Sequence, residues 1–148
     1  MSFHCGQFRQ MIHDILRLYP ELDSPSAENL LLGTAAQESE FGTYLYQLGG
    51  GPALGVFQME PTTYQWLSDK YSGKYHYLIG RPPWELPWNL KLGILSARLR
   101  YRVVPGPLPP AGDVLAMARY WAQWYNTKLG KGTAEQFIEN YRKYVKEV

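Results

Sequence analysis

The sequence contains little cysteine and little histidine. Cys5 is the only cysteine among 148 residues, so no internal disulfide can form. The three histidines, His4, His13 and His76, lack the paired spacing of a zinc enzyme. We therefore expect a fold that is stable without a disulfide, and a function that uses no metal and no other cofactor.

Strong net charge and long apolar runs are also missing. The formal net charge is only +2, which is too small to indicate a nucleic-acid partner. No apolar run approaches the length that spans a bilayer. Residues 1–19 do not read as a signal peptide, because polar and charged side chains interrupt them: Arg9, His13, Asp14 and Arg17. We expect synthesis in the cytoplasm without a signal peptide, and no stable membrane association.

Apolar and aromatic residues, in contrast, are abundant. Hydrophobic residues make up 45% of the chain and aromatic residues 15%, including 12 Tyr and 5 Trp. A chain of this length and composition usually forms one domain with a substantial core, so we expect a single domain over residues 1–148. The aromatic rings either fill that core or line a carbohydrate site, where ring faces pack against the apolar faces of sugars. Composition alone does not decide between these two interpretations.

The spacing of apolar residues predicts a mostly α-helical domain. Four of the predicted helices have a local sequence signal at their N-terminus. These signals are Ser24-Pro25, Pro61, Asp113 and the capping box Thr133-x-x-Gln136. Between residues 43 and 58, glycines favour turns and short extended pieces, a hairpin-like segment. Periodicity and these signals place helices over residues 8–19, 25–41, 61–67, 89–101, 114–125 and 134–145.

One carboxylate falls on the apolar face of a predicted helix. Glu38 follows Leu30 by eight residues and Thr34 by four, so the three side chains share a face. Burial favours the protonated form of a carboxyl group, which is the form that a general acid needs at neutral pH. Spacing alone equally allows a helix-terminal Glu bonded to the backbone or to an Arg. Glu40 lies about 200° further around the helix and should face solvent.

Four short motifs follow one another along most of the chain. They are Glu38-Ser39-x-Phe41, Gly55-Val56-Phe57-Gln58-x-x-Pro61, Asn89-Leu90-x-x-Gly93-Ile94 and Ala122-Gln123-Trp124-Tyr125-Asn126. In this order they resemble the lytic transglycosylase family, which has a goose-type lysozyme-like fold. Two features depart from the family pattern. Thr127-Lys128 stands where Ala-Gly is usual, and Gly49-Gly50-Gly51-Pro52 is inserted before the second motif.

The resemblance implies an α+β lysozyme-like fold with two helical lobes around a sugar-binding cleft. It also implies cleavage of the β-1,4 bond between N-acetylmuramic acid and N-acetylglucosamine in bacterial peptidoglycan. Glu38 is then the catalytic acid, and Ser39, Gln58, Tyr125 and Asn126 are the substrate-binding candidates. Tyr125 has a second interpretation, since it shares a helix face with Trp121 and can pack in the core. Ser39 has a second interpretation as well, in which its hydroxyl supports the local backbone.

The identity of a second catalytic group stays open in the sequence. Glycosidic cleavage needs a proton donor and a group that stabilises or traps the oxocarbenium-like centre. Glu60 is the candidate for a water-positioning base, although a Glu just before Pro61 can equally begin a helix. If no second carboxylate acts, the resemblance implies attack by the sugar's own 6-hydroxyl, which gives a 1,6-anhydro product. We favour this lytic transglycosylation.

Three alternatives remain. One is a hydrolytic muramidase, that is, a lysozyme or endolysin. Another is a chitinase-like glycosidase on the same fold. The third belongs to another class and is a non-catalytic module that binds the wall or builds a phage tail. The resemblance and the missing signal peptide together predict a bacteriophage protein that acts on the wall as a monomer. It would arrive there by holin-dependent release or as a virion component.

Overall fold

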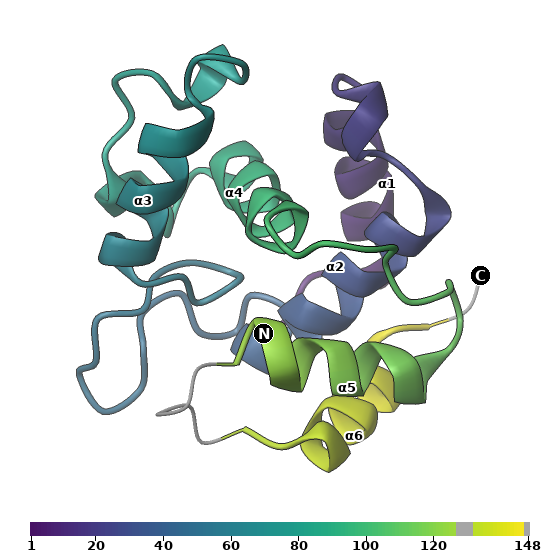
Figure 1. Cartoon of the computed structure of the whole chain (residues 1–148). Coiled ribbons are helices and arrows are strands. Elements are labelled where there is room, and N and C mark those ends of the chain that lie inside the picture. Colours follow the sequence, from purple (N-terminus) through teal and green to yellow (C-terminus); the bar gives the residue numbers. More distant parts are fainter. Residues whose placement is uncertain (127–131, 147–148) are drawn as a thin grey trace.

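The computed structural model describes residues 1–126 and 132–146, and within these ranges the protein is mostly helical (Figure 1). Three one-turn 3-10 helices, η1 (Pro20–Leu22), η2 (His76–Leu78) and η3 (Pro83–Glu85), lie in the connections. The described ranges contain no β-strand, so the β part of the α+β expectation is not seen. The six α-helices are α1 (Cys5–Leu16), α2 (Pro25–Ser39), α3 (Pro61–Tyr71), α4 (Leu90–Arg102), α5 (Val114–Trp124) and α6 (Ala134–Tyr144).

Three helices begin at caps that the sequence predicts, at Ser24, Asp113 and Thr133, and Asn89 caps α4 without having been predicted as a cap. The side chains of Ser24, Asn89 and Asp113 each accept a hydrogen bond from a backbone N–H in the first turn that follows. Thr133 and Gln136 form the predicted capping box at the start of α6. Each such cap stabilises a helix by about 1 kcal/mol. The helix predicted over residues 8–19 is instead Cys5–Leu16, because His4 caps it three residues earlier.

The segment between α2 and α3 is held by two isolated antiparallel bridges instead of a regular hairpin. Leu54 is the shared partner, since it pairs with Tyr46 on one side and with Met59 on the other. Gly55 has φ +83°, and a Cβ there would lie 2.6 Å from the Leu86 carbonyl oxygen. A side chain at position 55 is therefore excluded, and the turn that leads to the next helix can form only with glycine.

The buried side chains form two clusters that meet along α4. The first surrounds α2, which contacts α1, α4, α5 and α6. The second lies between α3, α4 and the connection that contains η2 and η3. Ile94 and Ala97 of α4 belong to the first cluster, whereas Leu95 and Leu99 belong to the second. Because opposite faces of one helix serve both clusters, α4 fixes the two parts of the molecule relative to each other.

Close packing of α2 against α6 depends on Gly33. A Cβ at this position would lie 2.5 Å from the ring of Phe137. Glycine therefore lets the two helices approach, and α2 is buried over most of its surface: ten of its 15 residues are buried. Such a helix, apolar nearly all round, is typical of the centre of a domain.

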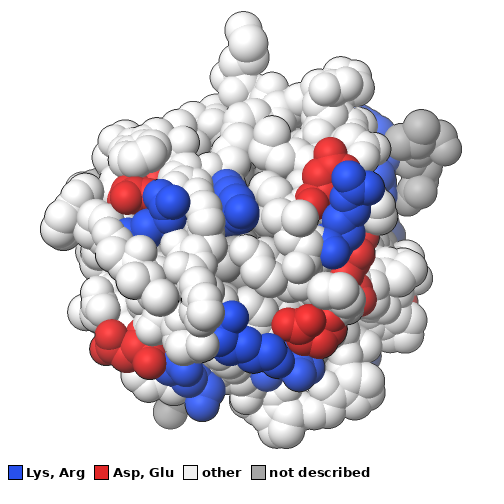
Figure 2. All heavy atoms as spheres, turned by 90° about the horizontal axis from the view of Figure 1, so that it is seen from above, with Lys and Arg blue, Asp and Glu red and all other residues white. Residues whose placement is uncertain are grey.

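Acidic and basic side chains are interspersed on the face that Figure 2 shows, without a large patch of one sign. Within the described residues, no helix is both long enough and apolar enough to cross a membrane.

Candidate active site

Glu38 lies in the last turn of α2 and is held by a hydrogen bond from α5. Trp121 Nε1 donates to Glu38 Oε2 at 2.9 Å. Burial raises the pKa of the Glu38 carboxyl from 4.5 to about 7, although the Trp121 hydrogen bond and the Arg100 charge act in the opposite direction. The position of Glu38 on the same helix face as Leu30 and Thr34 predicts this desolvation of its carboxyl group. Near neutral pH, Glu38 is therefore divided between its protonated and charged forms, as a general acid requires.

The Glu38 carboxyl opens into a cleft of about 330 Å³. This volume falls at the lower end of the range that small-ligand sites occupy. Its walls come from the end of α2, the 43–60 segment, the start of α3, the end of α4 and the end of α5. The lining residues are Gln37, Glu38, Gln47, Leu48, Ala53, Gln58, Glu60, Thr63, Arg100, Trp121, Tyr125, Asn126 and Gly132.

Five of the six predicted site residues line this cleft, and Ser39 does not: the five are Glu38, Gln58, Glu60, Tyr125 and Asn126. Ser39 is fully buried. Its hydroxyl donates to the Ala35 carbonyl oxygen and accepts a 2.8 Å hydrogen bond from the Gly42 N–H. The expectation that Ser39 contacts substrate is therefore corrected, because its hydroxyl supports the backbone that carries Glu38.

Glu40 also differs from its prediction. The helix ends at Ser39, and Glu40 adopts a left-handed conformation with φ 49°, so the helical angle of 100° per residue no longer applies to it. Its carboxylate is partly buried and accepts a 2.7 Å hydrogen bond from the Tyr144 hydroxyl. This hydrogen bond raises the pKa of Tyr144 to about 12. Glu40 thus joins the end of α2 to α6 and takes no part in the cleft lining.

Tyr125 belongs both to the core and to the cleft wall. Its ring is buried, and its hydroxyl donates a 2.6 Å hydrogen bond to the Phe57 carbonyl oxygen. The Arg100 guanidinium lies 4.1 Å from the ring centroid and donates to the Tyr125 carbonyl oxygen at 2.6 Å. Tyr125 therefore ties the end of α5 to the segment that precedes Gln58, and its hydroxyl hydrogen is not free for a ligand.

Two amide side chains line the cleft, Gln58 from the 43–60 segment and Asn126 from the residues after α5. Gln58 has φ 46°, and its Nε2 donates to the Gly55 carbonyl oxygen at 3.0 Å. A primary amide has a second hydrogen and a carbonyl oxygen, so Gln58 can still bond to a ligand. Asn126 Nδ2 donates to the Gly132 carbonyl oxygen at 2.8 Å. The departure at Thr127-Lys128 lies outside the described residues.

Arg100 and Trp121 complete the site, although the motifs did not identify either as a site residue. Arg100 lies near the end of α4, lines the cleft and carries a positive charge that acts to lower the Glu38 pKa. Trp121 was expected on the apolar face of its helix, where it indeed stacks near Phe137 with ring centroids 5.6 Å apart. No local signal distinguishes a buried indole that also donates to a carboxylate from one that only packs.

The aromatic residues of the 71–88 connection are separate from this cleft. Tyr75 is buried, packs edge-on against Tyr71 and donates a hydrogen bond to Glu21. Trp84 and Trp88 are mostly exposed. Tyr75 therefore belongs to the core, and none of these rings lines the cleft.

Comparison of the chain with protein-family profiles, with characterised proteins and with solved structures finds no significant match.

Proposed function

We propose that the protein cleaves the β-1,4 bond between N-acetylmuramic acid and N-acetylglucosamine in peptidoglycan, with Glu38 as the general acid. The observation that carries this proposal is the Glu38 carboxyl itself, which is partly buried at an open cleft, is oriented by Trp121 and has a pKa of about 7. A structural carboxylate usually forms an ion pair or caps a helix and keeps a low pKa. A raised pKa in a cleft is typical of an acid catalyst.

Glu38 would begin the reaction by giving its proton to the glycosidic oxygen. As the bond from that oxygen to C1 of the muramoyl sugar breaks, positive charge develops on the sugar ring. The Glu38 carboxylate that remains is stabilised by the Trp121 N–H and by the Arg100 charge. The sugar's 6-hydroxyl then forms a bond to C1, and its proton passes to Glu38. This step restores the acid and leaves a 1,6-anhydro sugar.

A hydrolytic reaction is the second candidate, because one other carboxylate lines the cleft. Glu60 caps the start of α3, is exposed, and makes no capping hydrogen bond with its side chain. It is therefore free to orient a water molecule toward C1, which would make the protein a muramidase or, with another polysaccharide, a chitinase-like glycosidase. We favour transglycosylation because proximity to a helix N-terminus already accounts for a carboxylate at position 60.

Mass spectrometry of muropeptides after digestion of purified peptidoglycan tests the proposal. Anhydro-muropeptides are expected from the wild type. Products with reducing ends only would replace transglycosylation by hydrolysis. Wall binding without any cleavage would support the alternative of a non-catalytic wall-binding or tail module. Parallel digestion of chitin oligosaccharides separates the chitinase-like alternative from both.

A further inference from the structure

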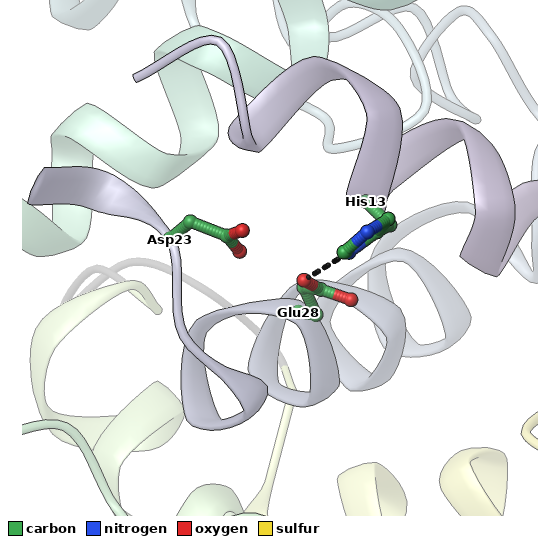
Figure 3. A group of neighbouring side chains, drawn as sticks. All are labelled: His13, Asp23 and Glu28. Atoms are coloured by element: carbon green, nitrogen blue, oxygen red, sulfur yellow. Dashed lines mark hydrogen bonds and ion pairs between the residues drawn. The ribbon is translucent and has the colours of Figure 1, made fainter. Parts of the chain in front are cut away.

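A second cluster of titratable side chains lies at the opposite end of α2 from Glu38. His13 comes from α1, Asp23 from the link between η1 and α2, and Glu28 from the first turn of α2 (Figure 3). Glu28 and Glu38 are ten residues apart, which is about 15 Å along a helix. The cluster is therefore distinct from the cleft, and the proposed glycosidic cleavage does not use it.

The side chains of this cluster point toward one another, as Figure 3 shows. His13 Nδ1 lies 2.9 Å from Glu28 Oε2, and one ligand atom from each residue lies within 4.8 Å of the others. Ligand atoms that share an ion at about 2 Å lie roughly 3 to 4 Å apart. The observed spacing matches such a site after small side-chain adjustments.

The polar atoms of this cluster are incompletely satisfied by the protein. Asp23 Oδ1 is a buried atom and has no hydrogen-bond partner. A buried acceptor without a partner costs about 1 to 3 kcal/mol. A bound cation would give the Asp23 oxygen the partner that it lacks.

We propose that His13, Asp23 and Glu28 bind a divalent transition-metal ion such as Zn²⁺ and thereby join α1 to the start of α2. One imidazole nitrogen with two carboxylates suits Zn²⁺ and similar ions, whereas Mg²⁺ and Ca²⁺ prefer oxygen ligands throughout. The His13 side chain is 46% exposed, which leaves a path for the ion and room for water ligands. On binding, the ion replaces the hydrogen between His13 Nδ1 and Glu28, and that proton leaves to solvent.

The proposed site differs from the sequence expectation of a protein without metal. A search for paired histidines or cysteines could not find it, because two of the three ligands are carboxylates and the ligands lie at positions 13, 23 and 28. The chain reverses between α1 and η1 and again before α2, and these two connections bring the three ligands together.

Isothermal titration of the metal-stripped full chain with Zn²⁺ tests the inference. We expect one ion per chain in the wild type and a rise of the melting temperature with Zn²⁺. His13→Gln and Glu28→Gln should each weaken binding by at least about tenfold, since even residues that only orient a metal ligand contribute that much. His13 is half-exposed, so the fold of His13→Gln should survive, which circular dichroism checks.

Two matched controls identify adventitious binding. His76→Gln removes an exposed histidine elsewhere, and Cys5→Ser removes the thiol, and neither should change the Zn²⁺ affinity. The site is refuted by a wild type that binds no Zn²⁺, by unchanged binding in His13→Gln, or by an equal loss in His76→Gln. Displacement of Zn²⁺ by a modest excess of Ca²⁺ would overturn the assigned class of metal.

Discussion

The indole N–H of Trp121 donates to the Glu38 carboxylate at 2.9 Å, although the two residues are 83 positions apart in the chain. Glu38 lies in the last turn of the central helix α2, and Trp121 lies on α5, which packs beside α2. The bond holds the carboxyl in one orientation toward the cleft. It also stabilises the charged form against a burial effect that strongly favours the neutral one.

Replacement of the acid should abolish cleavage. We expect Glu38→Gln to lose at least about 10²-fold in the release of soluble fragments from purified peptidoglycan, because an essential general acid contributes that much. Glu40→Gln is the matched control: a glutamine oxygen can still accept the Tyr144 hydrogen bond, so activity should change little. Near wild-type activity of Glu38→Gln would refute the assignment.

Glu38→Gln should also change the pH dependence of stability, which can be measured without substrate. Because folding raises the Glu38 pKa from 4.5 to about 7, the folded state binds the proton more tightly than the unfolded state. The contribution of Glu38 to stability is therefore complete below pH 4.5 and falls as the pH rises to about 7, by at most about 3 kcal/mol. Denaturant unfolding of the wild type and Glu38→Gln should diverge over this window, with the wild type losing stability relative to the variant. Parallel pH curves would contradict the raised pKa.

The pH dependence of cleavage should report the Trp121 hydrogen bond. We expect kcat/KM of the wild type to fall as the pH rises through about 7, because Glu38 loses the proton that it must donate. Trp121→Phe removes the donor and keeps a ring, so the Glu38 pKa and the alkaline limb should move to higher pH. An unchanged alkaline limb in a folded variant would show that the bond does not stabilise the carboxylate.

Glu60→Gln separates the two reaction mechanisms. If the 6-hydroxyl of the sugar is the nucleophile, the variant should keep most of its activity and release anhydro-muropeptides. If Glu60 orients a hydrolytic water, the variant should lose most turnover, and wild-type products should carry reducing ends. We expect the first result, since Glu60 lies exposed at the start of α3. Glu38 keeps its role under either result, because both reactions begin with protonation of the same oxygen.

Signals within a few residues determined much of the fold. The caps at Ser24, Asp113 and Thr133 predicted three helix starts, because a cap satisfies backbone groups only two or three residues away. The burial of Glu38 followed from its position on an apolar helix face. The order of the motifs along the chain, together with the search for a second carboxylate, predicted five of the residues that line the cleft: Glu38, Gln58, Glu60, Tyr125 and Asn126.

Tertiary structure alone decided which side chains meet around Glu38. Helix packing brings Trp121 and Arg100 to it from α5 and α4, and it places Asp23 beside His13 and Glu28. The end of α2 at Ser39 also decided two side-chain roles. The left-handed conformation of Glu40 directs its carboxylate to Tyr144 of α6 instead of to solvent, and the Ser39 hydroxyl bonds to the backbone instead of lining the cleft. Helical periodicity describes directions only while the helix continues, and contacts across tens of residues depend on how whole helices pack.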